Sequence, residues 1–485
     1  MPQSISRPEQ ATTVTLRVEA PSPSAEIFVI DHQLQLVDRG AGTLVTQLAP
    51  GIYKIKVQTG RDTQERTVLL TEDHSVTWER QPIDSAAPLI SSATTHEYHQ
   101  AGASARAGTV DVSRGTGGRL FVMVRSWSSN DPSRVIGRSR HPAAGLRVSP
   151  LDGAWSQELG DVAVHDADRE AWCAINMALD PGSYVLQRPH ASGTLLEQAV
   201  TVSRNWQTQV FLLDRVMPAH AAEPSGPPMP DAEIFGAAIL MGRNDFDPGD
   251  YQMELTEAAR LALADDRPVL NRQLDEMLRG KFDNPMLGIM GAHLLLLARE
   301  ADQARESDQE RRQQFQPSRR QVPRAQHPWN QSLFDTVIRH LQDLVGDDHP
   351  DVQALSLRAS APALRATRVT TPPMLHRSWS LLVAASNEQP ELVPLDLWRR
   401  TAMRTAATPF LCWMSSTQDP SIEDDFVKDL RAQIAAPVRV LESARPRVAR
   451  RPAAARGAAP QRDTAELSAA LGIPRAAVEW LVKGS

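Results

Sequence analysis

A chain of 485 residues with 41% hydrophobic and 23% charged residues is neither fibrous nor disordered throughout, and its length predicts about two to four domains. The net charge of −6 is small for this length, so no overall field favours nucleic acid or an anionic membrane. The longest apolar run, 286–298, is too short to span a bilayer, and the first residues lack the apolar core of a secretory signal. Cys173 and Cys412 lie far apart and suggest neither a metal site nor a disulfide framework. We therefore expect a cytoplasmic protein that does not bind a membrane.

The N-terminal segment, 13–78, alternates apolar and polar residues in short runs. The first run places Val14, Leu16 and Val18 on one face, and further runs of the same period follow with turn residues between them. Such alternation in short segments separated by turns is typical of an antiparallel β-sandwich. The sequence therefore predicts a first β-sandwich domain over 1–83.

A corner sequence occurs twice and indicates an internal duplication. Residues 48–53 read LAPGIY and residues 179–184 read LDPGSY, and in each case Pro and Gly make a turn before a strand. The two tyrosines are 131 residues apart, and Glu65 and Glu197 in the strands that follow are 132 apart. Because the register is kept across the whole hairpin, we predict a second, duplicate β-sandwich over 118–215.

Both units resemble the small carboxypeptidase-regulatory-like and PEGA-type β-sandwich modules. The hallmark of these modules is a Leu-x-Pro-Gly-x-Tyr corner before a strand, which residues 48–53 and 179–184 both match. The resemblance covers only the N-terminal half of the chain. It implies a non-catalytic binding or spacer module and carries no active-site residue over to this sequence.

Composition and period change outside the two sandwiches. Residues 84–117 are rich in Ser, Ala, Thr and Gly and predict a linker, as do the proline-rich residues 216–231. From 232 to 434 the apolar spacing is helical, which predicts an all-α domain, with 301–327 as a disordered loop because it has almost no apolar anchors. The helices expected in its second half span 329–345, 352–358, 374–385, 395–414 and 422–434. The predicted fold class is a multidomain α and β protein, with two antiparallel β-sandwiches followed by a helical domain.

Three local patterns raise the question of metal or catalytic chemistry. His96 and His99 are three residues apart, whereas a zincin helix needs a spacing of four. Residues 244–250 resemble a calcium loop, but Thr256 stands where a bidentate glutamate is required, so capping of the following helix explains them better. Cys173 shares a strand face with apolar residues and is predicted to fill the core. We therefore expect no cofactor, no metal ion and no catalytic residue.

The C-terminal residues 463–485 form the most distinctive pattern in the chain. Asp463 and Glu466 have the spacing of a capping box, Gly472 ends a first short helix, and Pro474 begins a second one. The apolar residues of both helices gather on one face and comprise Leu467, Leu471, Val478, Trp480 and Leu481. Two helices of this size bury too little surface to be stable alone, so this face is predicted to dock onto another surface.

Two destinations for this face remain open at the level of the sequence. Residues 435–462, rich in Pro, Ala and Arg, form a tether with an end-to-end distance of about 30 Å for a flexible coil. Such a tether allows docking onto a partner protein, and equally onto the helical domain of the same chain. We predict the first: a non-catalytic adaptor or regulatory scaffold that recruits a partner protein. The setting we expect is a bacterial signalling or defence system built around an enzyme such as a protease.

Two other functions remain as alternatives. A hydrolase site between the β and helical halves would use His165, Asp166 and Asp168. Nucleic-acid binding through the tether would depend steeply on salt and would use Arg445, Arg447, Arg450, Arg451, Arg456 and Arg462. A helix-turn-helix interpretation of 463–485 offers a groove only Arg475, a weak set for base contacts, so we do not expect nucleic-acid binding.

Overall fold

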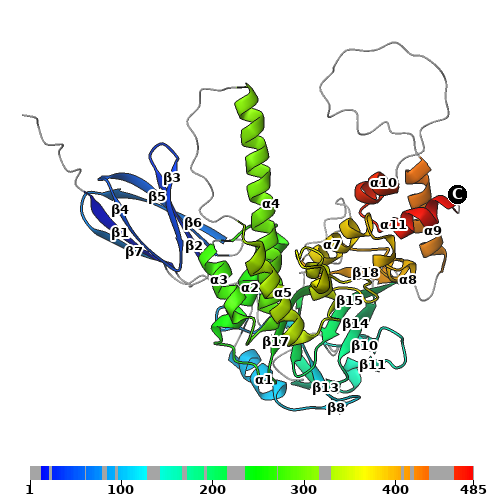
Figure 1. The fold of residues 1–485 in the computed structure, drawn as a ribbon. Helices are drawn as coiled ribbons and strands as arrows, with labels where there is room; N and C mark the ends of the chain where they lie inside the picture. Colours follow the sequence, from blue (N-terminus) through cyan, green and yellow to red (C-terminus); the bar gives the residue numbers. More distant parts are fainter. Residues whose placement is uncertain are drawn as a thin grey trace, which may run out of the picture.

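The computed structural model describes the chain in segments. These are residues 13–20, 25–59, 62–78, 85–92, 95, 97–127, 142–166, 172–189, 194–215, 235–269, 271–315, 329–405, 409–415, 420–435 and 464–483. Among them, four β-sheets dominate the N-terminal half and helices the C-terminal half (Figure 1). The predicted fold class is confirmed. No helix among the described residues is long and apolar enough to cross a membrane.

The first sandwich packs a three-stranded sheet on a four-stranded sheet. Its strands are β1 (Val14–Glu19), β2 (Glu26–Asp31), β3 (Leu36–Ala41), β4 (Thr43–Leu48), β5 (Gly51–Thr59), β6 (Asp62–Leu70) and β7 (His74–Thr77). The sheets have the orders β4-β1-β7 and β3-β2-β5-β6. Val14, Leu16 and Val18 are buried together as predicted, in a core that belongs to this sandwich alone.

The second sandwich repeats this strand order and adds strands at its edges. Its strands are β8 (Val112–Ser113), β9 (Gly118–Trp127), β10 (Arg147–Pro150), β11 (Gln157–Glu158), β12 (Val164–Asp166), β13 (Trp172–Leu179), β14 (Gly182–Pro189), β15 (Leu195–Val202), β16 (Gln207–Arg215), β17 (Phe235–Gly242) and β18 (Cys412–Ser415). The five-stranded sheet runs β11-β10-β14-β15-β18, and the six-stranded sheet runs β12-β13-β9-β16-β17 with β8 paired to β13. Their central parts, β13-β9-β16 and β11-β10-β14-β15, match β4-β1-β7 and β3-β2-β5-β6 in order and in strand direction. This shared topology supports the predicted duplication.

The two corner sequences have the same geometry. The Tyr53 hydroxyl donates to the carbonyl of Ala49 at 2.9 Å, and the Tyr184 hydroxyl donates to the carbonyl of Asp180 at 2.8 Å. The hairpins that follow, β5–β6 and β14–β15, also have matching registers. Burial is the main reason that the pKa of Tyr184 rises to about 12, so this hydroxyl remains a donor at neutral pH. Each corner thus fixes the start of its hairpin by one internal hydrogen bond.

Two strands of the second sandwich come from the region predicted to be all-α. β17 pairs with β16, and β18 pairs with β15. The prediction of one helix over 395–414 is therefore wrong, because α8 covers only Leu395–Arg400 and the apolar run after it forms β18. A short apolar run fits a buried strand as well as a buried helix, and the edge of β15 supplies the pairing that selects the strand.

Residues 84–117, predicted as a linker, are packed against the six-stranded sheet where they are described. α1 (Glu97–Ala107) buries Ala103 and Ala107, and β8 pairs with β13. Ala86, Ala87 and Leu89 lie in the same small core as residues of the sheet. We call residues 85–92 the strap, because all of them except Ile90 are buried and they are not a free connection. The linker prediction is wrong here, since small residues suit close packing as well as a loop.

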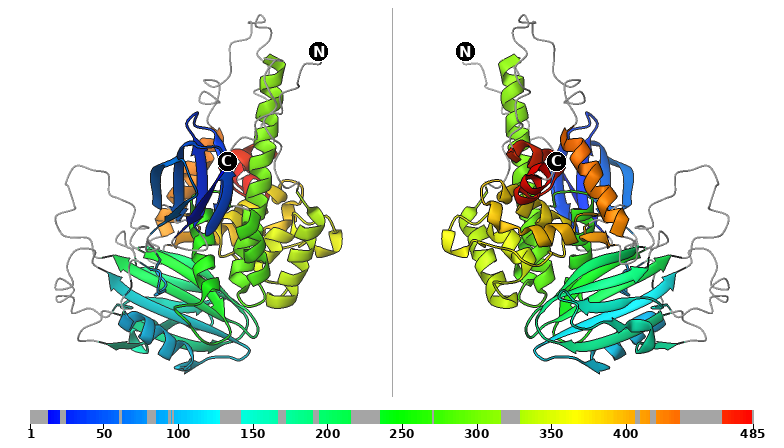
Figure 2. Two further views of the ribbon diagram at one scale, coloured as in Figure 1. Left: turned by 90° about the vertical axis from the view of Figure 1, so that its left-hand side faces the viewer. Right: turned by 90° about the vertical axis from the view of Figure 1, so that its right-hand side faces the viewer.

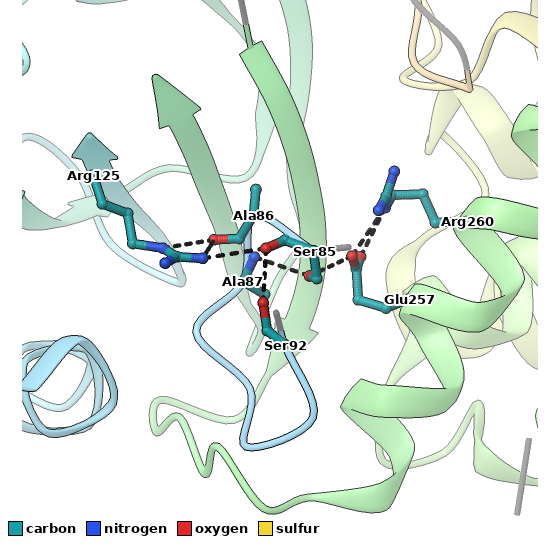
Figure 3. A network of polar contacts seen from close by, with 7 residues as sticks. All are labelled: Ser85, Ala86, Ala87, Ser92, Arg125, Glu257 and Arg260. Carbon is teal, nitrogen blue, oxygen red and sulfur yellow. Dashed lines mark hydrogen bonds and ion pairs between the residues drawn. The ribbon is translucent and has the colours of Figure 1, made fainter. Parts of the chain in front are cut away.

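A buried arginine ties the strap to the sheet. Arg125 on β9 donates to the carbonyl of Ala86 at 2.7 and 3.0 Å and to that of Ser85 at 3.2 Å (Figure 3). The Ser85 hydroxyl donates to Glu257 at 2.5 Å, and Glu257 pairs with Arg260 at 3.0 Å. Burial lowers the pKa of Arg125 to about 9, so its guanidinium is still charged at neutral pH. The network joins the sheet, the strap and the first helix of the helical region.

The helical region packs against the second sandwich. Its helices are α2 (Tyr251–Ala264), α3 (Asn271–Gly280), α4 (Pro285–Phe315), α5 (Gln331–Val345), α6 (Pro350–Ser356), α7 (His376–Ser386), α8 (Leu395–Arg400), α9 (Pro420–Ala435), α10 (Thr464–Leu471) and α11 (Arg475–Lys483). Asp250 caps α2 by accepting the Gln252 N–H at 2.8 Å, which confirms the capping interpretation of residues 244–250. Glu26 of the first sandwich forms an ion pair with Arg267, which follows α2.

The long helix α4 corrects the predicted disordered loop. Residues 301–315 continue this helix, which projects beyond the body of the molecule (Figures 1 and 2), so the prediction for 301–327 is wrong over this part. The rest of that range, 316–327, lies outside the described residues. The Ala, Glu, Gln and Arg residues of 301–315 are strong helix formers, and propagation from the buried first half of α4 does not require an apolar face.

Candidate functional site

The C-terminal module is a pair of short helices that packs on the helical region of the same chain. α10 and α11 match the two predicted helices, and Gly472 between them has a φ of +63°, the left-handed conformation that favours glycine. The pair lies against α7, α8 and α9 (Figure 1). Asp463, the predicted cap, and the tether residues 436–462 with all their arginines lie outside the described residues.

All five residues predicted to bind a partner lie in this intramolecular contact. Leu467, Val478 and Leu481 are buried, whereas Leu471 and Trp480 are half-buried against the same core. That core is continuous with the core of the helical region and the second sandwich. Of the two destinations that the sequence left open, the structure shows docking onto the helical region of the same chain. Binding of a partner protein by this face stays a prediction.

Three hydrogen bonds at the rim of this contact hold the module. The backbone N–H of Arg475 donates to the Ser386 hydroxyl at 3.1 Å, and its guanidinium donates to the carbonyl of Asn387 at 2.9 Å. From the other side, the Arg404 guanidinium donates to the carbonyl of Gly472 at 3.0 Å. We call these three contacts the latch.

Trp480 lies close to two arginines of neighbouring helices. Its ring is 6.0 Å from that of Trp398, and the guanidinium carbons of Arg399 and Arg431 are 5.7 and 5.2 Å from its centre. Cation–π contacts of this kind contribute about 0.5–1 kcal/mol each where they are exposed. The sequence predicted that Trp480 lies on the docking face. It could not predict its contacts with Arg399 and Arg431, because these arginines come from α8 and α9.

The residues of the alternative hydrolase site are only partly described. The backbone of His165 and Asp166 lies on β12, where His165 pairs with Cys173 of β13. Asp168 lies outside the described residues. The hydrolase alternative therefore stays untested.

A buried polar cluster in the helical region was not predicted. Asp351 of α6 accepts the backbone N–H groups of Met374 and Leu375 at 2.9 and 3.0 Å and the hydroxyl of Ser378 at 2.7 Å. The Nε2 atom of His293 lies 2.8 Å from the Ser378 hydroxyl oxygen. The side chains of all three polar residues are fully buried. The only sequence signal was His293 inside the apolar run 286–298.

The directions of these bonds do not suit a nucleophilic serine. The Ser378 hydroxyl donates its one hydrogen to Asp351, so its oxygen accepts from His293, which donates from Nε2. In a Ser-His-Asp triad the histidine instead accepts from the serine and lies between the other two residues. The arrangement is therefore suited to fixing α4, α6 and α7 relative to one another.

The same cluster predicts a loss of stability in acid. Burial, together with Arg377, lowers the pKa of His293 to about 3 from the ordinary 6.5. The unfolded chain therefore binds a proton as the pH falls below about 6.5, whereas the folded chain does not until about pH 3. Stability is present above pH 6.5 and is lost as the pH falls through this window.

We expect His293→Gln to reduce this acid sensitivity. The glutamine amide keeps a donor for Ser378 and removes the titrating group. The slope of the free energy of unfolding against pH should fall by up to about 1.4 kcal/mol per unit below pH 6. Urea denaturation at several pH values measures this slope, with His32→Gln at an exposed position as the control. An unchanged slope would contradict the assignment.

The remaining candidate groups are buried or isolated. Both cysteine thiols are buried, and burial raises the pKa of each to about 12. Cys173 lies in the core with Ile175 and Met177, as predicted, whereas Cys412 lies on a strand and not on the expected helix. Within the described segments no group of three or more His, Cys, Asp or Glu side chains is placed to hold a metal ion.

Comparisons with known proteins do not assign a family. The fold and the candidate site define a multidomain chain of two β-sandwiches and a helical region that carries a docked C-terminal module. No protein-family model and no curated protein matches it. Among solved structures it is similar to the Bacillus anthracis TIE protein, with 10% sequence identity and a TM-score of 0.17. The match covers 42% of this chain and 33% of that chain, so this chain spans about a third of its length. A likeness of this size carries no argument about function.

Proposed function

We propose that this protein is a non-catalytic adaptor whose C-terminal module exchanges between its own helical region and a partner protein. The observation that carries the proposal is that a two-helix unit, too small to be stable alone, buries one apolar face on the helical region and is held at the rim of this contact by three hydrogen bonds. Residues 436–463 separate this unit from α9 in the sequence, which is enough chain for the unit to move away from its site. Architecture alone suggests the partner, a bacterial effector enzyme such as a protease in the cytoplasm.

The docked state sets how tightly a partner can bind. A tethered module meets its own site at a high effective concentration, in the millimolar range for a short flexible linker. The apparent affinity for a partner is lowered by the fraction of molecules in which the module is open. Weakening the latch without altering the apolar face should therefore strengthen partner binding, whereas damage to the face should abolish it.

Two substitutions separate these effects. Arg475→Ala removes the hydrogen bond to Asn387 but keeps Leu467, Val478 and Leu481, and a rim contact of about 1 kcal/mol raises the open fraction roughly fivefold. Leu481→Asp also opens the module but places a charge on the face. We expect Arg475→Ala to increase partner capture and Leu481→Asp to abolish it.

Hydrogen exchange of α10 and α11 reports opening, and quantitative affinity purification from cells of the source organism reports capture. Lys483→Ala, at an exposed position on α11, is the matched control. Capture that is the same for the full chain and for a chain ending before residue 464 would refute the adaptor role. Equal capture by the two variants would refute exchange of the module.

A further inference from the structure

The duplicated sandwiches differ in how their edges are closed. In the second, β18 covers the outer edge of β15 and β17 covers the outer edge of β16. The equivalent strands of the first sandwich, β6 and β7, are the outermost strands of their sheets among the described residues. An exposed edge strand presents unpaired backbone N–H and C=O groups to any further strand. β6 is the longer of the two and has nine residues, against four in β7.

The edge of β6 carries the residue that anchors the added strand in the duplicate. β18 pairs with residues 195–198 of β15, which correspond to residues 63–66 of β6. In the duplicate, Glu197 accepts the indole N–H of Trp413 at 2.7 Å and the hydroxyl of Ser415 at 2.8 Å, both from β18. Its equivalent, Glu65, is 44% exposed and forms an ion pair with Lys54 of its own sheet. The acceptor is thus present at the same place, next to an open edge.

One end of the outer face beside this edge is apolar and exposed. Leu69 on β6 is 66% exposed and lies directly opposite Ile52 on β5, which is 52% exposed. The residue equivalent to Leu69 in the duplicate is Thr201, which is buried and in contact with Met374 of the helical region. The position that is buried beside Met374 in the second sandwich is therefore exposed in the first.

Two further exposed leucines lie at the β2–β3 hairpin of the same sheet. Leu36 on β3 is 53% exposed, and Leu34 in the turn before it is 78% exposed with a φ of +60°. A left-handed backbone conformation is unfavourable for a bulky side chain such as leucine, and Gly or Asn is more common at such a position in a turn. An apolar residue at such a position contributes nothing to the core of the sandwich.

We propose that the outer edge of β6 binds an extended segment of a partner protein, which adds to the sheet as an antiparallel strand. The segment that fits this edge has apolar residues at alternate positions and a tryptophan opposite Glu65. The indole N–H of this tryptophan donates to Glu65, as Trp413 of β18 donates to Glu197. Main-chain hydrogen bonds supply the pairing, and the exposed face at Leu69 and Ile52 receives the apolar side chains. This inference does not depend on the C-terminal module, which lies on the other side of the molecule in Figure 1.

The test uses a synthetic peptide that copies residues 409–415 with Cys412→Ser and a Lys-Lys tail for solubility. The labelled peptide is titrated into the full chain by fluorescence anisotropy, and a scrambled peptide with the same tail is the control. We expect saturable one-to-one binding of the copied peptide, with slower hydrogen exchange of the β6 amides. Protection of β15 and not β6 would overturn the proposal, because the peptide would then only have displaced β18.

Backbone methylation distinguishes an added strand from adhesion to the apolar face. In an antiparallel pair, only alternate residues of a strand point their N–H groups toward a given neighbour. We prepare two peptides, each N-methylated at one of the two alternate sets of residues. One set should lower the affinity more than a hundredfold and the other less than about threefold. Equal effects of the two sets would contradict strand addition.

Substitutions in the chain complete the test. Glu65→Gln should weaken the peptide about tenfold, because a charged acceptor is lost, whereas Glu72→Gln just beyond β6 should leave binding unchanged. Light scattering of the protein alone identifies a competing occupant. A dimer that dissociates on Leu69→Lys would show that the edge binds a second copy of this chain, which would overturn the proposal of a different partner.

Discussion

Replacement of Asp351 by alanine should lower the free energy of unfolding by about 4 kcal/mol, the largest loss that we expect from any single side chain in the helical region. The carboxylate accepts three hydrogen bonds, from Met374, Leu375 and Ser378, at a fully buried position. Its removal leaves two backbone N–H groups and a hydroxyl without an acceptor, and each buried orphan costs about 1–3 kcal/mol.

Urea denaturation followed by tryptophan fluorescence measures this loss, because Trp379 lies on α7 beside the cluster. Asp347→Ala removes an exposed carboxylate nearby and should change stability by less than about 0.5 kcal/mol. Asp351→Asn keeps one carbonyl oxygen as an acceptor and should lie between the two. A loss below about 1 kcal/mol for Asp351→Ala would show that water replaces the carboxylate, and that the cluster does not hold these helices together.

Arg125→Met should destabilise the protein by about 3 kcal/mol. The methionine side chain fills much of the space of the arginine, but the carbonyls of Ser85 and Ala86 lose their donors (Figure 3). Because these carbonyls belong to the strap, hydrogen exchange should rise in residues 85–92 before it rises in the sheet. Arg119→Met on the same strand β9, at a half-exposed position, is the control and should have little effect. Exchange that rises equally throughout the second sandwich would mean that the arginine supports the sheet and not the strap.

The sequence predicted those parts of the fold that local pattern determines. The alternation at Val14, Leu16 and Val18 and the corners before Tyr53 and Tyr184 correspond to strands and turns in the structure. Strand β18 could not be predicted in the same way. Three of its four residues are apolar, a run that suits a helix and a strand alike, and its pairing partner β15 lies far away in the sequence. Only the open edge of a distant strand decides between the two.

The prediction that the strap is part of a linker was wrong for a related reason. Serine and alanine are common in loops, and the sequence around Ser85 and Ala86 carries no apolar period. What makes these residues part of the core is the guanidinium of Arg125, whose burial the sequence of β9 does not reveal. Polar contacts between segments of this kind depend on the assembled fold.

The candidate site was predicted in its parts but not in its position. Both helices of the module follow from Gly472, Pro474 and the apolar spacing around them. The surface that receives them is assembled from three helices, and the arginines beside Trp480 come from two of these. Because no local signal links such residues, the sequence showed that the module must dock but not where.

The closing strand β18 also sets an order for folding during synthesis. The first sandwich has all its strands and all the buried residues of its core once Trp78 has left the ribosome. The second sandwich must wait between Val202 and Cys412 for its last strand, which takes roughly 10 to 40 s at ordinary translation rates. During that time the nascent chain exposes the edge of β15 to other polypeptides. We expect chaperone dependence to centre on this interval, so that chains stalled between residues 202 and 412 aggregate, whereas chains stalled near residue 90, which carry only the first sandwich, do not.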